Sequence, residues 1–363
     1  MRKEIVFYQL SLAGKAFLAP FYFGKKKVSF KPTFVSLEVE DGCNLRCLHC
    51  DIWKKRKKLK RMRLSEMKKV VRELKKWLGV FQLNLTGGEP FLNKETIPLI
   101  KYASSLGILV HTNSNGFLID GTLAKRIVAS GLNSISISLD NLDPKVHNRL
   151  RGNSQVFKRA VRALSSLSKF RKPSRPFLSV TTIIMKPTLS GLEKLAFWAK
   201  EEGIDAIYFQ SLWQNFGAEY DQDWFKKSPL WPKDYKKAKK VLDCLLKLKK
   251  NGYPIGNSFE DFERYKSYYR DPITFGGEKK CFIGVNNFAI DIAGDVRLCF
   301  NFPSIGNILK EKPEEIWNGR EAQKQRLKIA GCQRGCKVLL CNRIMSRKEA
   351  LVLLVNKARR FLR

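Results

Sequence analysis

Apolar and polar residues follow two different periods between residues 33 and 211. Six short runs rich in β-branched and apolar residues predict strands, and an amphipathic stretch that predicts a helix follows each of the first five. The predicted strands are 34–40, 80–85, 108–111, 134–139, 177–184 and 206–210. The predicted helices are 65–78, 94–106, 121–130, 156–170 and 189–202. Because parallel neighbouring strands need helical crossovers, this order predicts an α/β fold with a parallel sheet.

Six strand–helix units are fewer than the eight of a closed barrel, so we expect a partial barrel or a doubly wound sheet. In either fold, ligands collect at the carboxyl ends of the strands. Around this core at 33–211 we expect an apolar N-terminal helical segment at 1–32 and a bridge at 212–279 with one helix at 232–250. A small cysteine-rich domain at 280–342 and a basic amphipathic helix at 343–363 follow.

Composition adds a strong charge imbalance. The 363 residues include 69 Lys and Arg against 33 Asp and Glu, a net charge of +36, while 44% hydrophobic residues exclude global disorder. Such a surface attracts polyanions, which leaves nucleic acid, anionic lipid head groups and phosphorylated molecules open as partners. The densest basic run, from Lys54 to Arg63, predicts either a solvated loop or a screen for an anionic substrate.

The two ends of the chain resemble each other in pattern. An apolar run from Ile5 to Phe23 has basic flanks, but Lys15 and Pro20 argue against a membrane-spanning helix, and no cleavage site for export follows. The tail from Arg347 to Arg363 is again apolar and basic. We therefore expect a cytoplasmic protein whose terminal helices either pack on the core or lie on an anionic membrane surface.

Nine cysteines are too few for a disulfide scaffold, and they are clustered. Cys43, Cys47 and Cys50 follow the first predicted strand at C-x3-C-x2-C spacing, which favours metal chemistry in a reducing compartment. A structural zinc site wants four ligands, whereas three thiolates on an iron–sulfur cube leave one iron open to a small molecule. We favour the cube. Cys244 lies alone on a helical pattern and is predicted to be a core residue.

A second motif, Gly87-Gly88-Glu89, ends the second predicted strand. Glycines let a backbone approach a ligand closely, and a carboxylate can accept hydrogen bonds from an ammonium group. On its own this is an ordinary strand-to-helix turn. One unit after the cysteine loop, it resembles the radical S-adenosylmethionine (SAM) superfamily. That resemblance implies a partial (β/α)6 TIM-type barrel, a [4Fe–4S] cluster on the three cysteines and a SAM amino group at the Gly-Gly-Glu motif.

The resemblance extends to the next loops. His49 occupies the usually aromatic position before the third cysteine, which in the family lies near the adenine. Asn113 and Asn115 resemble the Asn-Gly turn after the third strand, with Ser114 as an insertion that leaves the alignment open. The resemblance therefore implies SAM-binding roles for His49 and Asn113.

Ser138 and Asp140 resemble the fourth-strand motif, whose positions neighbour the SAM ribose and carboxylate. An arginine that follows could pair with that carboxylate, and spacing does not choose between Arg149 and Arg151. An ordinary helix-entry turn is the alternative interpretation of these residues. Gln210, at the end of the sixth strand, is predicted either to face the mouth or to pack in the core.

The remaining cysteines resemble the SPASM and twitch extensions of radical SAM enzymes, which carry auxiliary iron–sulfur clusters. Five are present where a full SPASM pattern has seven, so the resemblance implies one auxiliary [4Fe–4S] cluster, with structural zinc as the alternative. Its ligands would be Cys281, Cys299 and two of Cys332, Cys336 and Cys341. Four cysteine ligands leave no open iron, so we expect electron relay.

By this resemblance the protein is an enzyme that cleaves SAM reductively to a 5′-deoxyadenosyl radical, fed by a reductant such as ferredoxin or flavodoxin. The radical would abstract hydrogen from a peptide or protein, or from a membrane-associated lipid precursor. Charge alone keeps an RNA substrate open, although no nucleic-acid binding module is visible. A non-enzymatic iron–sulfur protein is the alternative from a different class.

Overall fold

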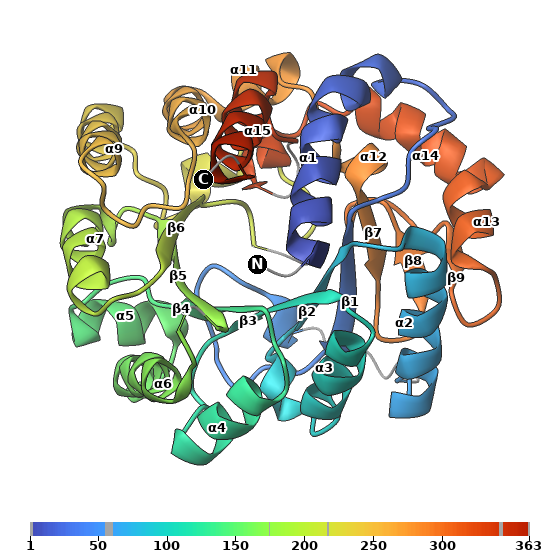
Figure 1. Ribbon diagram of the computed structural model, residues 1–363. Coiled ribbons are helices and arrows are strands. Elements are labelled where there is room, and N and C mark those ends of the chain that lie inside the picture. Colours follow the sequence, from blue (N-terminus) through green and yellow to red (C-terminus); the bar gives the residue numbers. More distant parts are fainter. Residues whose placement is uncertain (1–2, 55–60, 174, 216–217, 341–343, 362–363) are drawn as a thin grey trace.

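In the computed structural model, a single nine-stranded sheet forms the centre of the molecule (Figure 1). The structure describes residues 3–54, 61–173, 175–215, 218–340 and 344–361. Six consecutive strands pair in parallel, in the order in which they occur along the chain. They are β1 (Phe34–Glu40), β2 (Gln82–Gly87), β3 (Leu109–Ser114), β4 (Ser134–Ser138), β5 (Phe177–Ile184) and β6 (Ala206–Ser211). This confirms the predicted α/β fold with a partial barrel.

Helices between these strands cover the outside of the barrel. They are α2 (Leu64–Leu78), α3 (Thr96–Ser105), α4 (Gly121–Ala129), α5 (Pro144–Arg151), α6 (Val156–Phe170) and α7 (Leu192–Glu201). Short 3₁₀ helices η1 (Ile52–Lys54), η2 (Pro90–Leu92) and η3 (Leu189–Gly191) stand at loop positions. The amphipathic pattern explains the packing: α2 buries Met67, Val70, Val71 and Leu74, spaced along one helical face.

The cysteine-rich C-terminal segment continues the barrel's own sheet. Strand β7 (Asn287–Ile290) pairs in parallel with β1, and β8 (Asp295–Arg297) and β9 (Gly306–Asn307) follow antiparallel. The helices α12 (Ile283–Asn286), α13 (Pro313–Asn318), α14 (Arg320–Ala330) and η4 (Gly335–Val338) complete this segment. The hairpin expected from the sequence is present. Its attachment to the free edge of β1 follows from tertiary pairing, which no local pattern encodes.

The bridge holds more helices than the one that we expected at 232–250. It contains α8 (Trp224–Lys227), α9 (Tyr235–Lys250), α10 (Phe259–Arg270) and α11 (Pro272–Glu278). The prediction missed α10 because its buried face is made largely of tyrosines, which a hydrophobicity pattern undervalues. Their hydroxyls are satisfied inside the protein: Tyr269 accepts a hydrogen bond from the Leu212 amide (2.9 Å) and donates one to the Ile184 carbonyl (2.7 Å).

The first and last helices lie together across the amino ends of the strands (Figure 1). The hydroxyl of Tyr8 on α1 (Lys3–Tyr22) donates to Gln82, the first residue of β2, over 3.0 Å. Helix α15 (Arg347–Phe361) packs through Ala350 against Ala13 and Ala16 of α1. Among the described helices, none is both long and apolar enough to cross a membrane.

Candidate functional site: a cysteine loop at the barrel mouth

Three cysteines occupy the loop that leaves the carboxyl end of β1. Cys43, Cys47 and Cys50 are all half-buried and free of disulfides. The loop is held to the end of α5, because the Leu48 amide donates to the Leu150 carbonyl (2.9 Å). A neighbouring bond joins the Arg46 amide to the next carbonyl of α5. The three thiols therefore belong to one short loop whose path a neighbouring helix fixes.

The Gly87-Gly88 pair packs directly on this loop. A Cβ atom at Gly88 would lie 2.0 Å from the Gly42 carbonyl oxygen, and one at Gly87 would lie 1.8 Å from that of Glu40. The backbone bonds here confirm the close approach: the Gly88 amide donates to the Glu40 carbonyl (2.7 Å) and the Glu89 amide to the Gly42 carbonyl (2.9 Å). Both glycines are thus needed to bring the ends of β1 and β2 together.

The Glu89 side chain points into the protein. Its carboxylate accepts hydrogen bonds from the Ser114 hydroxyl (2.8 Å), the Asn115 amide (2.8 Å) and the Phe91 amide (3.3 Å). Burial raises the pKa of Glu89 to about 7. These three bonds tie the β3 loop to the Gly-Gly-Glu turn, and because a carboxylate can accept about four hydrogen bonds, they do not use the full accepting capacity of Glu89.

Of the two β3 asparagines, Asn115 is the one at the cysteine loop. Its side-chain amide donates to Asn44 (2.8 Å) and reaches within 4.0 Å of the Cys43 sulfur. Asn113 is exposed and lines a cavity inside the barrel. Sequence spacing could not separate the two, because Ser114 between them turns inward to Glu89.

Beyond β4 lies a buried ion pair. Asp140 is fully buried, and Arg151 donates to both its oxygens, over 2.6 and 3.0 Å. Although burial alone raises the pKa of Asp140, the Arg151 charge lowers it to about 2. Arg149, two residues earlier, is exposed. Of the two arginines, Arg151 is therefore the one that pairs with Asp140. Ser138 is half-buried at the end of β4.

His49 lies beside this pair. It is buried, its Nδ1 has no hydrogen-bond partner in the described part of the chain, and burial lowers its pKa to about 4. The charge of Arg151 acts in the same direction. A neutral imidazole with an orphaned nitrogen at the cysteine loop is a group that a bound molecule could satisfy.

The donor set fits an iron–sulfur cluster. Burial raises the pKa of the Cys43 thiol to about 11 and also raises the pKa values of Cys47 and Cys50, so the metal-free loop holds neutral thiols. Thiolates bind metals, and a cationic centre supplies the charge that deprotonates them. Among the described side chains, no group of three or more Cys, His, Asp or Glu is placed to hold a metal ion as they stand.

A cavity of about 490 Å³ fills the inside of the barrel. Its polar wall consists of neutral groups, among them the amides of Gln82, Asn84, Asn113 and Gln210 and the hydroxyls of Ser136, Ser179 and Thr181. His111 is part of the same wall, and burial lowers its pKa to about 4, so it is also uncharged at neutral pH. Tyr8 of α1 closes the amino end. Gln210 thus faces the inside of the barrel.

The sequence analysis missed Glu38. It shares the inner face of β1 with Phe34, which lines the cavity, because alternate residues of a strand point the same way. Burial raises its pKa to about 7, with Asp291 adding to the effect. A carboxyl group in that range can accept or release a proton near neutral pH. The alternating pattern of 34–40 contained this signal.

The C-terminal cysteines gather around a buried lysine. Lys337 is 3% exposed, donates to the Gly276 carbonyl (2.5 Å) and interacts electrostatically with Cys332, Cys281 and Cys336. Cys299 is coupled in the same way to Cys332. Cys341 lies outside the described residues. Four of the five predicted auxiliary ligands are thus in one region. The buried Lys337 lies among them, and no sequence motif predicted its position.

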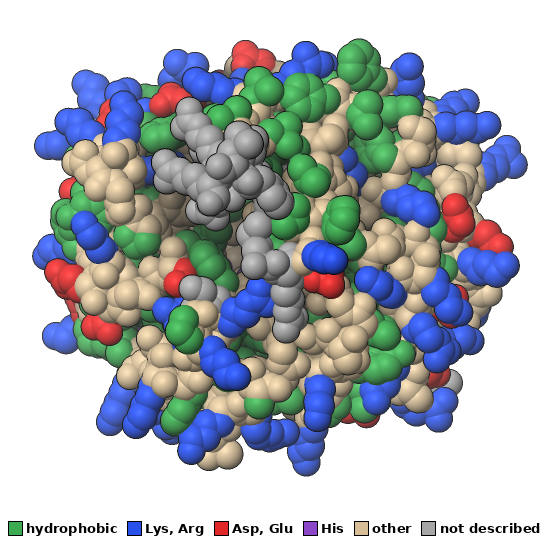
Figure 2. Space-filling view, viewed as in Figure 1, with side chains coloured by type: hydrophobic (Ala, Val, Ile, Leu, Met, Phe, Trp, Pro, Cys, Tyr) green, Lys and Arg blue, Asp and Glu red, His purple; other side chains and the backbone are tan. Residues whose placement is uncertain are grey.

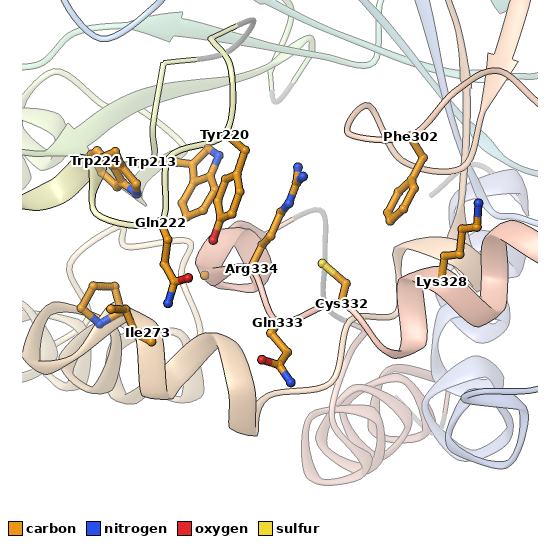
Figure 3. Close-up of a pocket in the computed structure, with 12 residues that line it drawn as sticks. Trp213, Tyr220, Gln222, Trp224, Ile273, Phe302, Lys328, Cys332, Gln333 and Arg334 are labelled. Carbon is orange, nitrogen blue, oxygen red and sulfur yellow. The ribbon is translucent and has the colours of Figure 1, made fainter.

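Figure 3 shows a second cavity, of about 300 Å³, at these cysteines. The Cys332 sulfur points into it, between Arg334 and Phe302. The Arg334 guanidinium lies 4.1 Å from the centre of the Tyr220 ring, which in turn stacks on Trp213. The cavity therefore joins the bridge to the cysteine-rich segment.

Most of the basic run 54–63 lies outside the described residues. Within the described part, Arg61 donates to Glu40 (3.0 Å) and pairs with Asp41 at the root of the cysteine loop. Cys244 is half-buried on α9, away from the other cysteines in sequence.

Two family models match the chain. The radical SAM superfamily model covers residues 37–199, and the model of the iron–sulfur cluster-binding SPASM domain covers 281–342. Among curated proteins, the chain is 25% identical to an AdoMet-dependent heme synthase of Methanosarcina barkeri, over 80% of this chain and 83% of that protein. It is 31% identical to the mycofactocin maturase MftC of Mycolicibacterium smegmatis, over 38% of this chain and only 34% of the maturase.

Solved structures show the same fold. The enzyme anSMEcpe with bound AdoMet has a TM-score of 0.64 at 20% identity, covering 92% of this chain and 98% of that one. SuiB of Streptococcus suis, bound to its precursor peptide SuiA, has a TM-score of 0.64 at 15% identity, covering 93% and 76%. With the cysteine loop, the Gly-Gly-Glu turn and both family models in agreement, the chain belongs to the radical SAM superfamily, as an enzyme with a SPASM domain that uses SAM and iron–sulfur clusters.

Proposed function

We propose that Cys43, Cys47 and Cys50 hold the catalytic [4Fe–4S] cluster at the mouth of the barrel. Bound there, a cluster would supply the one-electron reduction by which this superfamily cleaves SAM. The chain's own part is to fix the loop through the Gly87-Gly88 contact and the α5 bonds, and to exclude water from the reacting atoms. Asn115, within 4.0 Å of the Cys43 sulfur, donates toward the cluster.

SAM would lie among the side chains around this loop. His49 has a ring nitrogen with no hydrogen-bond partner among the described residues, and Asn113 and Ser138 stand at the carboxyl ends of β3 and β4. The hydrogen bonds between Arg151 and Asp140 fix the end of α5 beside the cysteine loop. Arg149, two residues away on α5, is exposed.

The substrate that the barrel fits best is a peptide or a segment of a protein. The observation that carries this proposal is the cavity wall, which is lined by amides and hydroxyls and lacks Asp, Glu, Lys and Arg among its described residues. Peptide groups are neutral and need both donors and acceptors, and such a wall supplies both. A structural neighbour with a bound precursor peptide, and a relative named as a mycofactocin maturase, support this proposal.

The auxiliary cluster would be held by Cys281, Cys299 and two of Cys332, Cys336 and Cys341. Lys337 lies beneath three of these cysteines, and a nearby cation stabilises the extra negative charge of a reduced cluster. This arrangement supports electron relay between the substrate and an external donor such as ferredoxin or flavodoxin.

The test begins with reconstituted protein under anaerobic reduction with SAM. We expect wild type to form 5′-deoxyadenosine, and the Cys43/Cys47/Cys50 triple alanine variant to form none while it keeps the auxiliary iron. If the triple variant forms as much product as wild type, the assignment of the catalytic cluster is overturned.

The substrate class is tested with three pools taken from the source organism: peptides, extracted lipids and total RNA. We expect the peptide pool alone to increase 5′-deoxyadenosine formation several-fold, with new peptide masses in mass spectrometry. Stimulation by lipid or RNA without stimulation by peptide would overturn the peptide proposal and leave the SAM chemistry standing.

A further inference from the structure

In helix α1 the one charged side chain of the apolar run is buried, and several large apolar side chains face solvent. Lys15 is the only charged residue between Ile5 and Phe23, yet it is 5% exposed. It donates to Thr33 (3.2 Å) and Asn286 (3.3 Å), beneath the amino ends of β1 and β7. The solvent side of the helix is instead apolar: Phe7 is 59% exposed, and Phe21 is 64% exposed.

The exposed apolar residues form two pairs on one face of the helix. Phe7 with Leu10 and Leu18 with Phe21 recur with helical spacing, exposed Ser11 and Gly14 lie between the pairs, and the face extends over the 15 residues from Phe7 to Phe21. At 1.5 Å per residue, Phe7 and Phe21 lie about 21 Å apart along the helix axis. Figure 2 shows hydrophobic side chains gathered along the position that α1 occupies in Figure 1. Several large apolar side chains exposed on one face of a helix mark an interaction site.

Helix α15 adds a second apolar strip beside the first. Its Leu351, Val352 and Val355 are each about half-exposed, while Ala350 packs on α1. Arg347 lies with its guanidinium 6.0 Å from the Phe21 ring, which places a cation at the edge of the apolar face. The two ends of the chain therefore form one surface. We call it the α1–α15 face.

Exposed basic residues lie at both ends of α1 and at the start of α15. Lys3 begins α1, Lys25, Lys26 and Lys27 follow its end, and Lys348 begins α15, and all of these are exposed. An apolar face with basic residues at its ends is complementary to an anionic bilayer: hydrocarbon side chains enter the interface and lysines meet lipid phosphates. A protein partner would need its own acidic groups beside an apolar patch, and the net charge of +36 opposes self-association of this face.

We propose that the α1–α15 face binds the surface of anionic membranes. The helices lie flat in the head-group region and do not cross the bilayer. Because α1 covers the amino ends of the barrel strands, the cysteine loop at their carboxyl ends faces away from the membrane. The inference concerns docking and is independent of the proposed substrate.

The experiment is flotation of full-length protein with vesicles of phosphatidylglycerol and phosphatidylcholine in equal parts, and with phosphatidylcholine alone. We expect binding to the anionic vesicles and little to the neutral ones. The double variant Phe7→Ser/Phe21→Ser should bind at least tenfold more weakly, because both rings already face solvent in the free protein. Replacing Lys25, Lys26 and Lys27 by Gln should weaken binding roughly a hundredfold at low salt.

Phe197→Ser is the matched control, since Phe197 is an exposed aromatic on α7, on the outside of the barrel. It should bind vesicles within twofold of wild type, and circular dichroism should show that all variants are folded. Equal binding by wild type and the Phe7→Ser/Phe21→Ser variant overturns the proposal. Absence of vesicle binding by wild type also overturns it. The proposal is equally overturned if wild type does not bind vesicles and sedimentation equilibrium shows a dimer formed through this face.

Discussion

Two arginines two residues apart on α5 have opposite surroundings. Arg151 is buried against Asp140, while Arg149 is exposed. Removing one partner of a buried pair leaves an uncompensated charge, so we expect Arg151→Met to lower the free energy of unfolding by about 3 kcal/mol or more. Arg149→Met should change it by less than about 0.5 kcal/mol. Urea denaturation of both variants tests this, and equal losses would show that the buried pair contributes nothing special.

Gly88 is the residue on which the meeting of the two motif loops depends. A Cβ atom there would lie 2.0 Å from the Gly42 carbonyl oxygen. Relieving this clash requires the backbone itself to move, because the clashing atom does not belong to a flexible side chain. We expect Gly88→Ala to displace the cysteine loop, so that reconstituted protein loses about as much iron as the Cys43/Cys47/Cys50 triple alanine variant loses.

Gly277→Ala is the control, because Gly277 is exposed on α11 and a Cβ atom at this position would have no neighbouring atom within 4 Å. Its iron content should equal that of wild type. Full cluster loading in Gly88→Ala would mean that the loop tolerates the displacement.

For single residues, the sequence predicted which side chains are candidates for the site better than it predicted which side chains they contact. The spacing of Cys43, Cys47 and Cys50 alone singles them out as candidate cluster ligands. The choice between Arg149 and Arg151 was not evident from spacing, because it depends on which side of α5 meets the fully buried Asp140. The role of Asn115 was equally hidden, since an inserted Ser114 decides which asparagine reaches the cysteine loop.

Among the elements, α1 carries an energetic cost in its buried lysine. Burial lowers the pKa of Lys15 to about 7, so between pH 7 and its ordinary value near 10.5 the unfolded chain binds more protons than the folded one. Stability therefore rises with pH across this window. We expect Lys15→Met to raise the free energy of unfolding at pH 7 by about 2 kcal/mol and to flatten that pH dependence.

Lys3→Met provides the comparison on the same helix, since Lys3 is exposed. It should alter stability by less than about 0.5 kcal/mol at either pH. Denaturation at pH 7 and pH 10 measures both variants, and a loss of stability in Lys15→Met would show that its bonds to Thr33 and Asn286 outweigh the cost of burial.

For helices and strands, too, local sequence patterns predicted what they encode, and contacts between distant segments were not predicted. The six barrel strands and the longer helices between them have strong periodic patterns, and the sequence placed them, although it missed the short α5. Helix α10 was missed because its buried tyrosines pack with satisfied hydroxyls. The pairing of β7 with β1 joins residues some 250 positions apart in the chain, and short-range patterns carry no information on such contacts.

For the molecule as a whole, the net charge of +36 implies self-repulsion in the folded state. Salt screens interactions between exposed charges. We therefore expect the Tm to rise by several degrees when NaCl is increased from about 20 mM to about 500 mM. Thermal unfolding followed by circular dichroism measures this, and a Tm that falls with salt would show that attractive ion pairs dominate the surface.

Strand β1 has a consequence for the two redox centres proposed for this enzyme. One end of β1 leads into Cys43, and its free edge carries β7, whose hairpin leads to Cys299. A hinge between two such centres would let the distance between them change. The hydrogen-bonded pairing of β1 with β7 instead holds the two cysteine regions at one separation, which is set when the chain folds.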